Sequence, residues 1–221
     1  MPMKDKFFGL LLALIAILVV FPFFRNFPIV NALLKVFITA VLLLSVYAIS
    51  ENKRSLFIAS GLCTPGIIFN WMSHFYDHSV PIIFANLFIF LFSIYIIYEI
   101  LIKIFSSKSV TIHLIYGALC VYFLIGFAWG FLFNVIEIIN PGSFKLNTLN
   151  FVNGEHSLTA PKNLPSFIYY SFITLTTLGY GDITPLTPPA QSLSAFEAII
   201  GQLYLTVLVA WLVGLLVANR E

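Results

Sequence analysis

One short run between two long apolar segments holds the residue types best suited to binding a bare cation: Thr176-Thr177-Leu178-Gly179-Tyr180-Gly181-Asp182. Its two glycines alternate with larger residues, and glycine reaches left-handed conformations that a Cβ disfavours. Such a backbone can present its carbonyl oxygens in successive layers. Four copies around one axis would form stacked rings of oxygens, which replace the water around a dehydrated cation.

The sequence around this run indicates a loop that enters the membrane and returns. A helix-length segment at 165–176 precedes the run, and Pro165 suits a first helical turn because its missing N–H costs nothing there. Apolar spans lie on both sides. The competing interpretation is a Gly/Tyr turn in a re-entrant loop that has no ion path.

The composition is typical of a membrane protein. Hydrophobic residues make up 60% of the chain and charged residues 9%, against about 25% charged in soluble domains. Cys63 and Cys120 fall inside apolar spans, which indicates small buried hydrophobes and not a disulfide framework. The helices show no nucleophile–base or metal-ligand spacing, so we expect no enzyme and no resident cofactor. Nothing in the charge pattern indicates a nucleic-acid partner.

A helix that crosses a bilayer needs about 20 apolar residues. The first apolar run is interpreted as a retained helix, because no small-residue cleavage site of a signal peptide follows it. The fold class is therefore an all-α integral membrane protein, with a four-helix module at 1–109 and a pore domain at 110–221. Six spanning helices are expected, at 7–24, 30–50, 56–72, 80–105, 111–139 and 190–219.

Lysine and arginine predict the orientation, because cytoplasmic loops carry an excess of them. With both termini in the cytoplasm, the inside ends hold Lys4, Lys6, Lys53, Arg54, Lys103, Lys108 and Arg220. The outside ends hold Arg25, Lys35, Lys145 and Lys162. This bias predicts a multi-pass protein of the cell (plasma) membrane, in contact with lipid, whose loop between the fifth and sixth spans is extracellular.

The fourth span contains no Lys or Arg from Pro81 to Ile102. A steep voltage response requires about three to four gating charges in each subunit. We therefore predict that the first four helices do not form a voltage sensor.

The extracellular loop at 140–164 forms a turret before the pore segment. Two short extended runs flank Asn153-Gly154, and Asn-Gly is a strong hairpin signal. A disordered polar loop is an equally compatible interpretation.

The pore half, roughly residues 110–219, resembles the potassium channel pore-loop family, whose filter usually reads T-V-G-Y-G. Leu178 replaces the valine here. The resemblance implies a homotetramer with an outer helix at 111–139, a pore helix at 165–176, a filter at 177–181 and an inner helix at 190–219. It also implies K⁺ as the permeant ligand, bound by the backbone carbonyls of Thr177, Leu178, Gly179 and Tyr180 and the Thr177 hydroxyl, with Gly179 and Gly181 supplying backbone freedom.

Residues beside the filter are expected to support it, and the resemblance extends to several of them. Thr176 ends the pore helix, and Tyr169 and Tyr170 match paired aromatic positions that pack against the filter tyrosine, although simple aromatic filling is compatible. Asp182 would form an acidic ring at the outer mouth or cap the following turn. Some family members carry a carboxylate behind the filter, at the position where this chain has Ile173.

An acid within an apolar span is a functional candidate by default. Glu197 lies about two turns into the last span. Our hypothesis is that it hydrogen-bonds a pore-helix hydroxyl such as that of Ser171 or Thr174 and steadies the filter. The alternative is a carboxylate that faces external water.

The last span should line the ion path. Gly201 matches the family's inner-helix hinge glycine, and glycine in a helix interior costs roughly 1 kcal/mol relative to alanine, so packing or bending should account for it. Gly214 is a rival hinge. One helical face is expected to meet the ions, at Gln202, Leu205, Val209 and Val213.

These patterns predict a potassium-selective channel that conducts K⁺ passively through a tetrameric pore. A weakly selective monovalent cation channel is the first alternative, because Leu178 departs from the usual filter. A subunit of a potassium uptake system ranks lower, since those proteins carry four imperfect pore loops in one chain. The chain ends shortly after the last helix, so an unknown regulatory subunit is a candidate source of gating.

Overall fold

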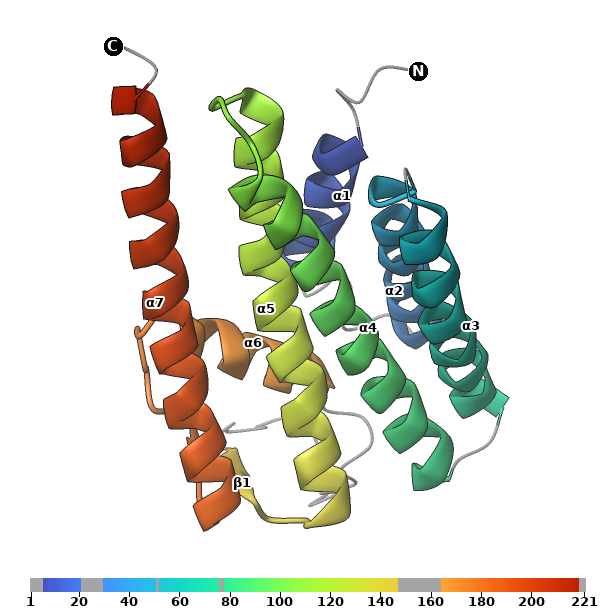
Figure 1. Cartoon of the computed structure of the whole chain (residues 1–221). Helices are drawn as coiled ribbons and strands as arrows, with labels where there is room; N and C mark the ends of the chain where they lie inside the picture. The colour runs from blue at the N-terminus through green and yellow to red at the C-terminus, as the bar shows by residue number, and fades with distance from the viewer. Residues whose placement is uncertain (1–5, 21–29, 51, 76–77, 147–163, 219–221) are drawn as a thin grey trace.

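The computed structural model describes residues 6–20, 30–50, 52–75, 78–146 and 164–218. Long helices lie side by side, and a short helix is held between two of them (Figure 1). The elements in chain order are α1 (Lys6–Ile15), the π-helix η2 (Ala16–Val20), α2 (Val30–Ala48), α3 (Lys53–Phe75), α4 (Ser79–Phe105), α5 (Ile112–Ile139), β1 (Phe144–Leu146), α6 (Leu164–Leu175), β2 (Ile183–Pro185) and α7 (Pro188–Ala218).

Four helices are long and apolar enough to cross a membrane: Lys53–Ser73, Ser79–Phe105, Ile112–Ile139 and Pro188–Val217. They confirm a helical membrane protein. The first two predicted spans appear as shorter apolar helices over Lys6–Val19 and Ala32–Ala48. Within the described residues, four of the six predicted spans are therefore helices long enough to cross a membrane.

The predicted pore elements agree closely with the helices observed. The outer helix corresponds to α5, the pore helix to α6 and the inner helix to α7, each within two residues at either end. In Figure 1, α1 begins and α7 ends at the same end of the bundle, and α4 connects to α5 there. The short helix α6 lies in the opposite half of the bundle, between α5 and α7.

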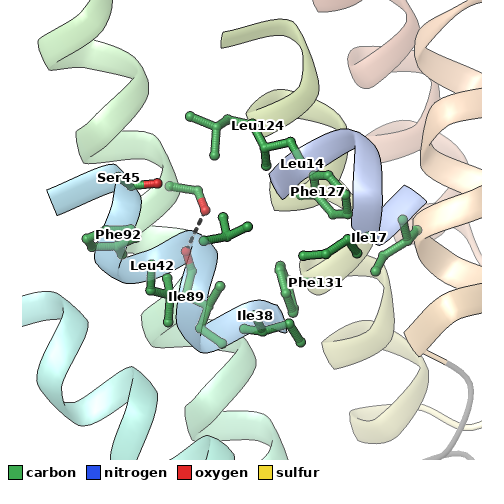
Figure 2. Close-up of a pocket in the computed structure, with 13 residues that line it drawn as sticks. Leu14, Ile17, Ile38, Leu42, Ser45, Ile89, Phe92, Leu124, Phe127 and Phe131 are labelled. Carbon is green, nitrogen blue, oxygen red and sulfur yellow. Dashed lines mark hydrogen bonds between the residues drawn. The ribbon is translucent and has the colours of Figure 1, made fainter. Parts of the chain in front are cut away.

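Two of the first four helices, α1 and α4, pack directly against α5, whereas α2 packs on α1 and α3, and α3 packs on α4. Figure 2 shows the small pocket that remains where α1, α2, α4 and α5 meet, with walls such as Leu14, Leu42, Phe92 and Phe127. Its volume is about 20 Å³, which is room for about one water molecule. The described part of the module is thus a packed bundle that joins the pore half through α1 and α4.

Candidate ion-conduction site

The filter run begins as a direct continuation of α6. The Thr177 amide donates to the Thr174 carbonyl at 2.9 Å, and the amides of Leu178 and Gly179 donate to the Ile173 carbonyl at 3.0 and 3.2 Å. These bonds turn three successive N–H groups back toward α6. The last carbonyls of α6 therefore bind the filter backbone, which satisfies groups that a helix end otherwise leaves without partners.

Alternate residues of the filter adopt left-handed backbone conformations. The φ angles are 58° at Thr177, 55° at Gly179 and 77° at Gly181, whereas Leu178 and Tyr180 lie at negative φ. Alternation of right- and left-handed residues brings successive main-chain groups to one side of a chain. Both glycines thus occupy positions that require them, as the sequence indicated.

Thr177 is a strained residue, because positive φ is a genuine outlier for a β-branched side chain. Such conformations cost about 1–3 kcal/mol and persist where the surroundings impose them. Here the Thr177 amide is held by α6, and its hydroxyl accepts a hydrogen bond from Gln202 Nε2 of α7 at 3.4 Å. Two helices therefore hold the inner end of the filter.

The predicted ion-facing side of α7 is exposed in the single subunit. Gln202, Leu205, Val209 and Val213 are all exposed, as are residues 176–182 of the filter run. The Gln202 hydrogen bond places this side of α7 next to the filter's inner end. An ion path at a symmetry axis would require the filter and this side of α7 to be exposed together. That these side chains line such a path stays a prediction.

A two-stranded ladder holds the outer end of the filter. Strand β1 pairs antiparallel with β2, with Leu146 opposite Ile183 and Phe144 opposite Pro185. The Leu186 amide also donates to the Ser143 carbonyl at 2.8 Å. For the turret, the sequence left open a hairpin around Asn153-Gly154 or a disordered polar loop, and these residues lie outside the described ones. The ladder was not predicted.

Asp182 caps the turn that leaves the filter. Its Oδ1 accepts a hydrogen bond from the Ile183 amide at 3.1 Å, so the capping role weighed in the sequence is present. Its carboxylate also interacts with the Tyr169 hydroxyl. Both groups are exposed in the single subunit, and an acidic ring in an assembly stays a prediction.

Glu137 anchors β1 and was missed by the sequence reading. Its Oε1 accepts from the Gly142 amide at 2.9 Å, and its Oε2 accepts from the Phe144 amide at 3.0 Å. The side chain is buried near the end of α5. The sequence did contain an indication of this role, because an acidic residue alone in an apolar span needs a polar partner.

Three glycines let α6 lie against its neighbours at backbone distance. A Cβ at Gly126 would lie 2.7 Å from the Phe172 ring, and one at Gly130 would lie 2.8 Å from the Ile168 Cα. A Cβ at Gly201 would lie 2.3 Å from the Leu175 carbonyl oxygen. Gly126 and Gly130 form a small-x-x-x-small pair, a known signal for close helix packing, that the sequence reading overlooked.

Gly201 is therefore explained by packing. The helix α7 is continuous through this position, and the Leu175 carbonyl occupies the space of a side chain. The predicted role as a hinge is not needed to account for the glycine. At the rival position, Gly214, a Cβ would meet nothing within 4 Å.

Glu197 is fully buried and reaches behind the pore helix. Ser171 Oγ forms hydrogen bonds with Glu197 Oε1 and, at 2.6 Å, with the Gly126 carbonyl. This geometry confirms the predicted contact with a pore-helix hydroxyl and selects Ser171. The alternative of a carboxylate facing external water is wrong, because Glu197 is 0% exposed. The contact joins α5, α6 and α7 at one point.

Tyr170 provides a second tie between α6 and α7. Its hydroxyl donates to Ser194 Oγ at 2.7 Å, and its ring packs edge-on against Phe133 and Phe144. It therefore fills an aromatic cluster with α5 and β1. At the end of the same helix, the Thr176 hydroxyl donates back to the Phe172 carbonyl at 2.7 Å.

The arrangement is that of a pore module: two long helices hold a short re-entrant helix, and a strained, glycine-containing loop returns from it. The chain matches the family model described as ion channel over residues 82–218, which begins within α4 and covers most of the chain. No curated protein and no solved structure is significantly similar to it.

The protein therefore belongs to the ion channel family of the two-helix, potassium-channel pore type. It is a membrane ion channel and not an enzyme. Members of this family assemble as oligomers in membranes.

Proposed function

We propose that the protein is a potassium-selective channel that conducts K⁺ passively through a homotetrameric pore in the cell membrane. The observation that carries this proposal is the alternation of left-handed residues at Thr177, Gly179 and Gly181. Together with the N–H groups bound to α6, it leaves the filter carbonyls available to an ion. Rings of such carbonyls replace the hydration shell of K⁺.

Assembly as a tetramer follows from the number of pore loops. One chain supplies one filter strand, and a closed ring needs four, most simply related by cyclic symmetry. The exposed filter and the exposed inner-facing side of α7 are the surfaces that such a ring would bury or line. Backbone carbonyls of residues 177–180 would bind the ions, without any resident cofactor.

The first four helices serve as a membrane module in this proposal, with α1–η2 and α2 also crossing the bilayer. Helices α1 and α3 begin and α4 ends at the same end of the bundle (Figure 1). The chain near these helix ends contains Lys6, Lys53, Arg54, Lys103 and Lys108, and this basic charge favours the cytoplasm. The span α4 supplies no basic residue before its last turn, so voltage is not the proposed stimulus.

The test is a flux and bilayer measurement on the purified full-length chain. We expect reversal potentials close to the K⁺ equilibrium value in mixed K⁺ and Na⁺, and block by Ba²⁺. Gly179→Ala should abolish conduction, because an L side chain is strained at positive φ. Absence of K⁺ flux, or an assembly without fourfold symmetry, would exclude the proposal.

A weakly selective cation channel is the second candidate, and Leu178 favours it. Leu178 is the one filter residue that departs from T-V-G-Y-G, and its side chain is exposed in the subunit. A Leu178→Val variant separates the two. If K⁺ is already strongly preferred over Na⁺ in the natural chain, the valine variant should change little. If the preference is weak, the variant should raise it.

A further inference from the structure

One buried junction behind the filter joins three helices through three oxygen atoms. Ser171 Oγ of α6 lies 2.6 Å from the Gly126 carbonyl oxygen of α5 and forms a second hydrogen bond with Glu197 Oε1 of α7. Ser171 and Glu197 are both 0% exposed. Since solvent does not reach these side chains, the hydrogen atoms in both bonds must come from the three residues themselves.

Counting these hydrogen atoms assigns the protonation state of Glu197. A carbonyl oxygen can only accept, and a serine hydroxyl has one hydrogen to donate. Because the Gly126 carbonyl accepts, the single Ser171 hydrogen is used in that bond. The hydrogen of the second bond must then be carried by Glu197, which donates to Ser171 Oγ as the neutral acid.

The other surroundings of the carboxyl also favour the neutral acid. Its Oε2 has no hydrogen-bond partner within the described part of the chain. Glu197 is the only Asp, Glu, Lys, Arg or His of α7, α6 contains none, and α5 contains only His113 and Glu137, near its two ends. These three helices therefore place no cation beside the carboxyl, and an isolated buried carboxylate is strongly disfavoured.

The junction acts on the filter through α6. Two residues after Ser171, the Ile173 carbonyl binds two filter amides. A carboxylate can only accept, so loss of the Glu197 proton would leave one Ser171 hydrogen for two acceptors. One of the two contacts would break, and α6 would be released from α5 or from α7 next to the filter.

We propose that Glu197 is a positioning residue that holds the filter only as the neutral acid, and that its ionisation at alkaline pH stops ion conduction. The titratable groups that face it from the packed helices are the phenols of Tyr122 on α5 and Tyr170 on α6, which interact electrostatically with its carboxyl. This role requires ion conduction but not potassium selectivity, so it applies to both candidate functions.

Flux through the purified full-length chain in liposomes, measured at neutral and at alkaline pH, tests this role. The natural chain should lose its flux as the pH is raised. Glu197→Gln should conduct at both pH values, because its amide N–H can donate to Ser171 and does not ionise. Tyr122→Phe should retain the alkaline loss, which separates the carboxyl from the phenol.

Three results of the flux measurement would overturn the proposal. They are a natural chain whose flux is the same at neutral and alkaline pH, an alkaline loss that persists in Glu197→Gln, and an alkaline loss that disappears in Tyr122→Phe. A natural chain without flux at any pH would count against the proposed function instead, and the protonation state is then tested without flux.

Infrared spectroscopy measures that protonation state directly, because a neutral carboxyl has a C=O stretching band that a carboxylate lacks. The natural chain should show this band at neutral pH and lose it at alkaline pH. The band should be missing in Glu197→Gln and present in Glu137→Gln. Glu137 is the matched control, since it is buried but both of its oxygens accept amide hydrogen bonds, as a carboxylate does. Identical carboxyl bands in the natural chain and Glu197→Gln would overturn the proposal.

Discussion

The two long helices that flank α6 differ in how they are buried. In the apolar stretch of α5, 72% is buried within the subunit, whereas in that of α7 only 11% is buried. Helix α5 therefore lies in the interior of the subunit, whereas most of α7 lies at its surface. An apolar helix with so little internal packing is typical of a surface that further copies of the chain, or lipid, will cover.

The few contacts of α7 are consequently specific ones. They include a close backbone approach at Gly201, the Glu197–Ser171 and Ser194–Tyr170 hydrogen bonds, and a hydrogen bond from the Tyr204 hydroxyl to the Ala118 carbonyl. Three of these join α7 to α6. Close approach and hydrogen bonds to α6 therefore contribute to the position of the inner helix beside the filter.

The largest effect is expected at Gly201. Gly201→Ala would place a methyl group 2.3 Å from the Leu175 carbonyl oxygen, and the backbone of α6 or α7 would have to move. Overpacking of this kind costs about 1–3 kcal/mol or more, and the shift acts next to the filter. We expect a lower midpoint of thermal unfolding and loss of ion flux.

Gly214→Ala is the matched control for this prediction. It lies on the same helix with nothing within 4 Å of the added atom, and alanine favours helix by about 1 kcal/mol. It should be as stable as the natural chain or more so. If Gly201→Ala behaves in the same way, the close approach of α6 and α7 is refuted.

The next effect is expected at Ser171. Ser171→Ala leaves the buried Glu197 carboxyl without its partner, and an unsatisfied buried polar group costs about 1–3 kcal/mol. A double-mutant cycle with Glu197→Ala should give a coupling energy of about 0.5–3 kcal/mol, measured by unfolding in detergent. Ser192→Ala, at an exposed serine of α7, should change stability little. A coupling energy near zero would show that the two side chains act independently.

A related test concerns α5, where Glu137 holds the start of β1. Glu137→Gln keeps one acceptor oxygen and loses the charge, whereas the native carboxylate accepts two amide bonds. Hydrogen bonds to charged groups contribute about 1.5–3 kcal/mol. We expect faster hydrogen exchange at the Gly142 and Phe144 amides, with the helix α5 itself still protected. Unchanged exchange at both amides would exclude the anchoring role.

The smallest effect is expected at Tyr204. Tyr204→Phe removes the hydrogen bond to the Ala118 carbonyl, and interhelical hydrogen bonds in membranes average about 0.6 kcal/mol. A small decrease in the unfolding midpoint should result, whereas Tyr98→Phe, at an exposed tyrosine of α4, should have none. A Tyr204→Phe effect as large as that of Gly201→Ala would mean that α7 is held by polar contacts and not by close approach.

The helices of the pore half could be predicted from the sequence, but the pairing of its two short strands could not. The ranges of α5, α6 and α7 follow from apolar length, from Pro165 near a helix start and from glycines after it, all of which are local signals. The ladder between β1 and β2 has no such signal. It joins residues 144–146 to residues 183–185, and each strand has only three residues, so nothing in either segment indicates the other.

The sequence by itself determined that this chain is a membrane protein with a filter-like loop between two spans, because hydrophobicity and backbone freedom are properties of consecutive residues. Only the tertiary structure decided that Ser171 and not Thr174 meets Glu197, that Gly201 makes room for a carbonyl, and that Gln202 reaches Thr177. Those outcomes depend on how each helix is rotated and how closely it approaches its neighbour. Rotation and approach are set by the packing of all three helices together.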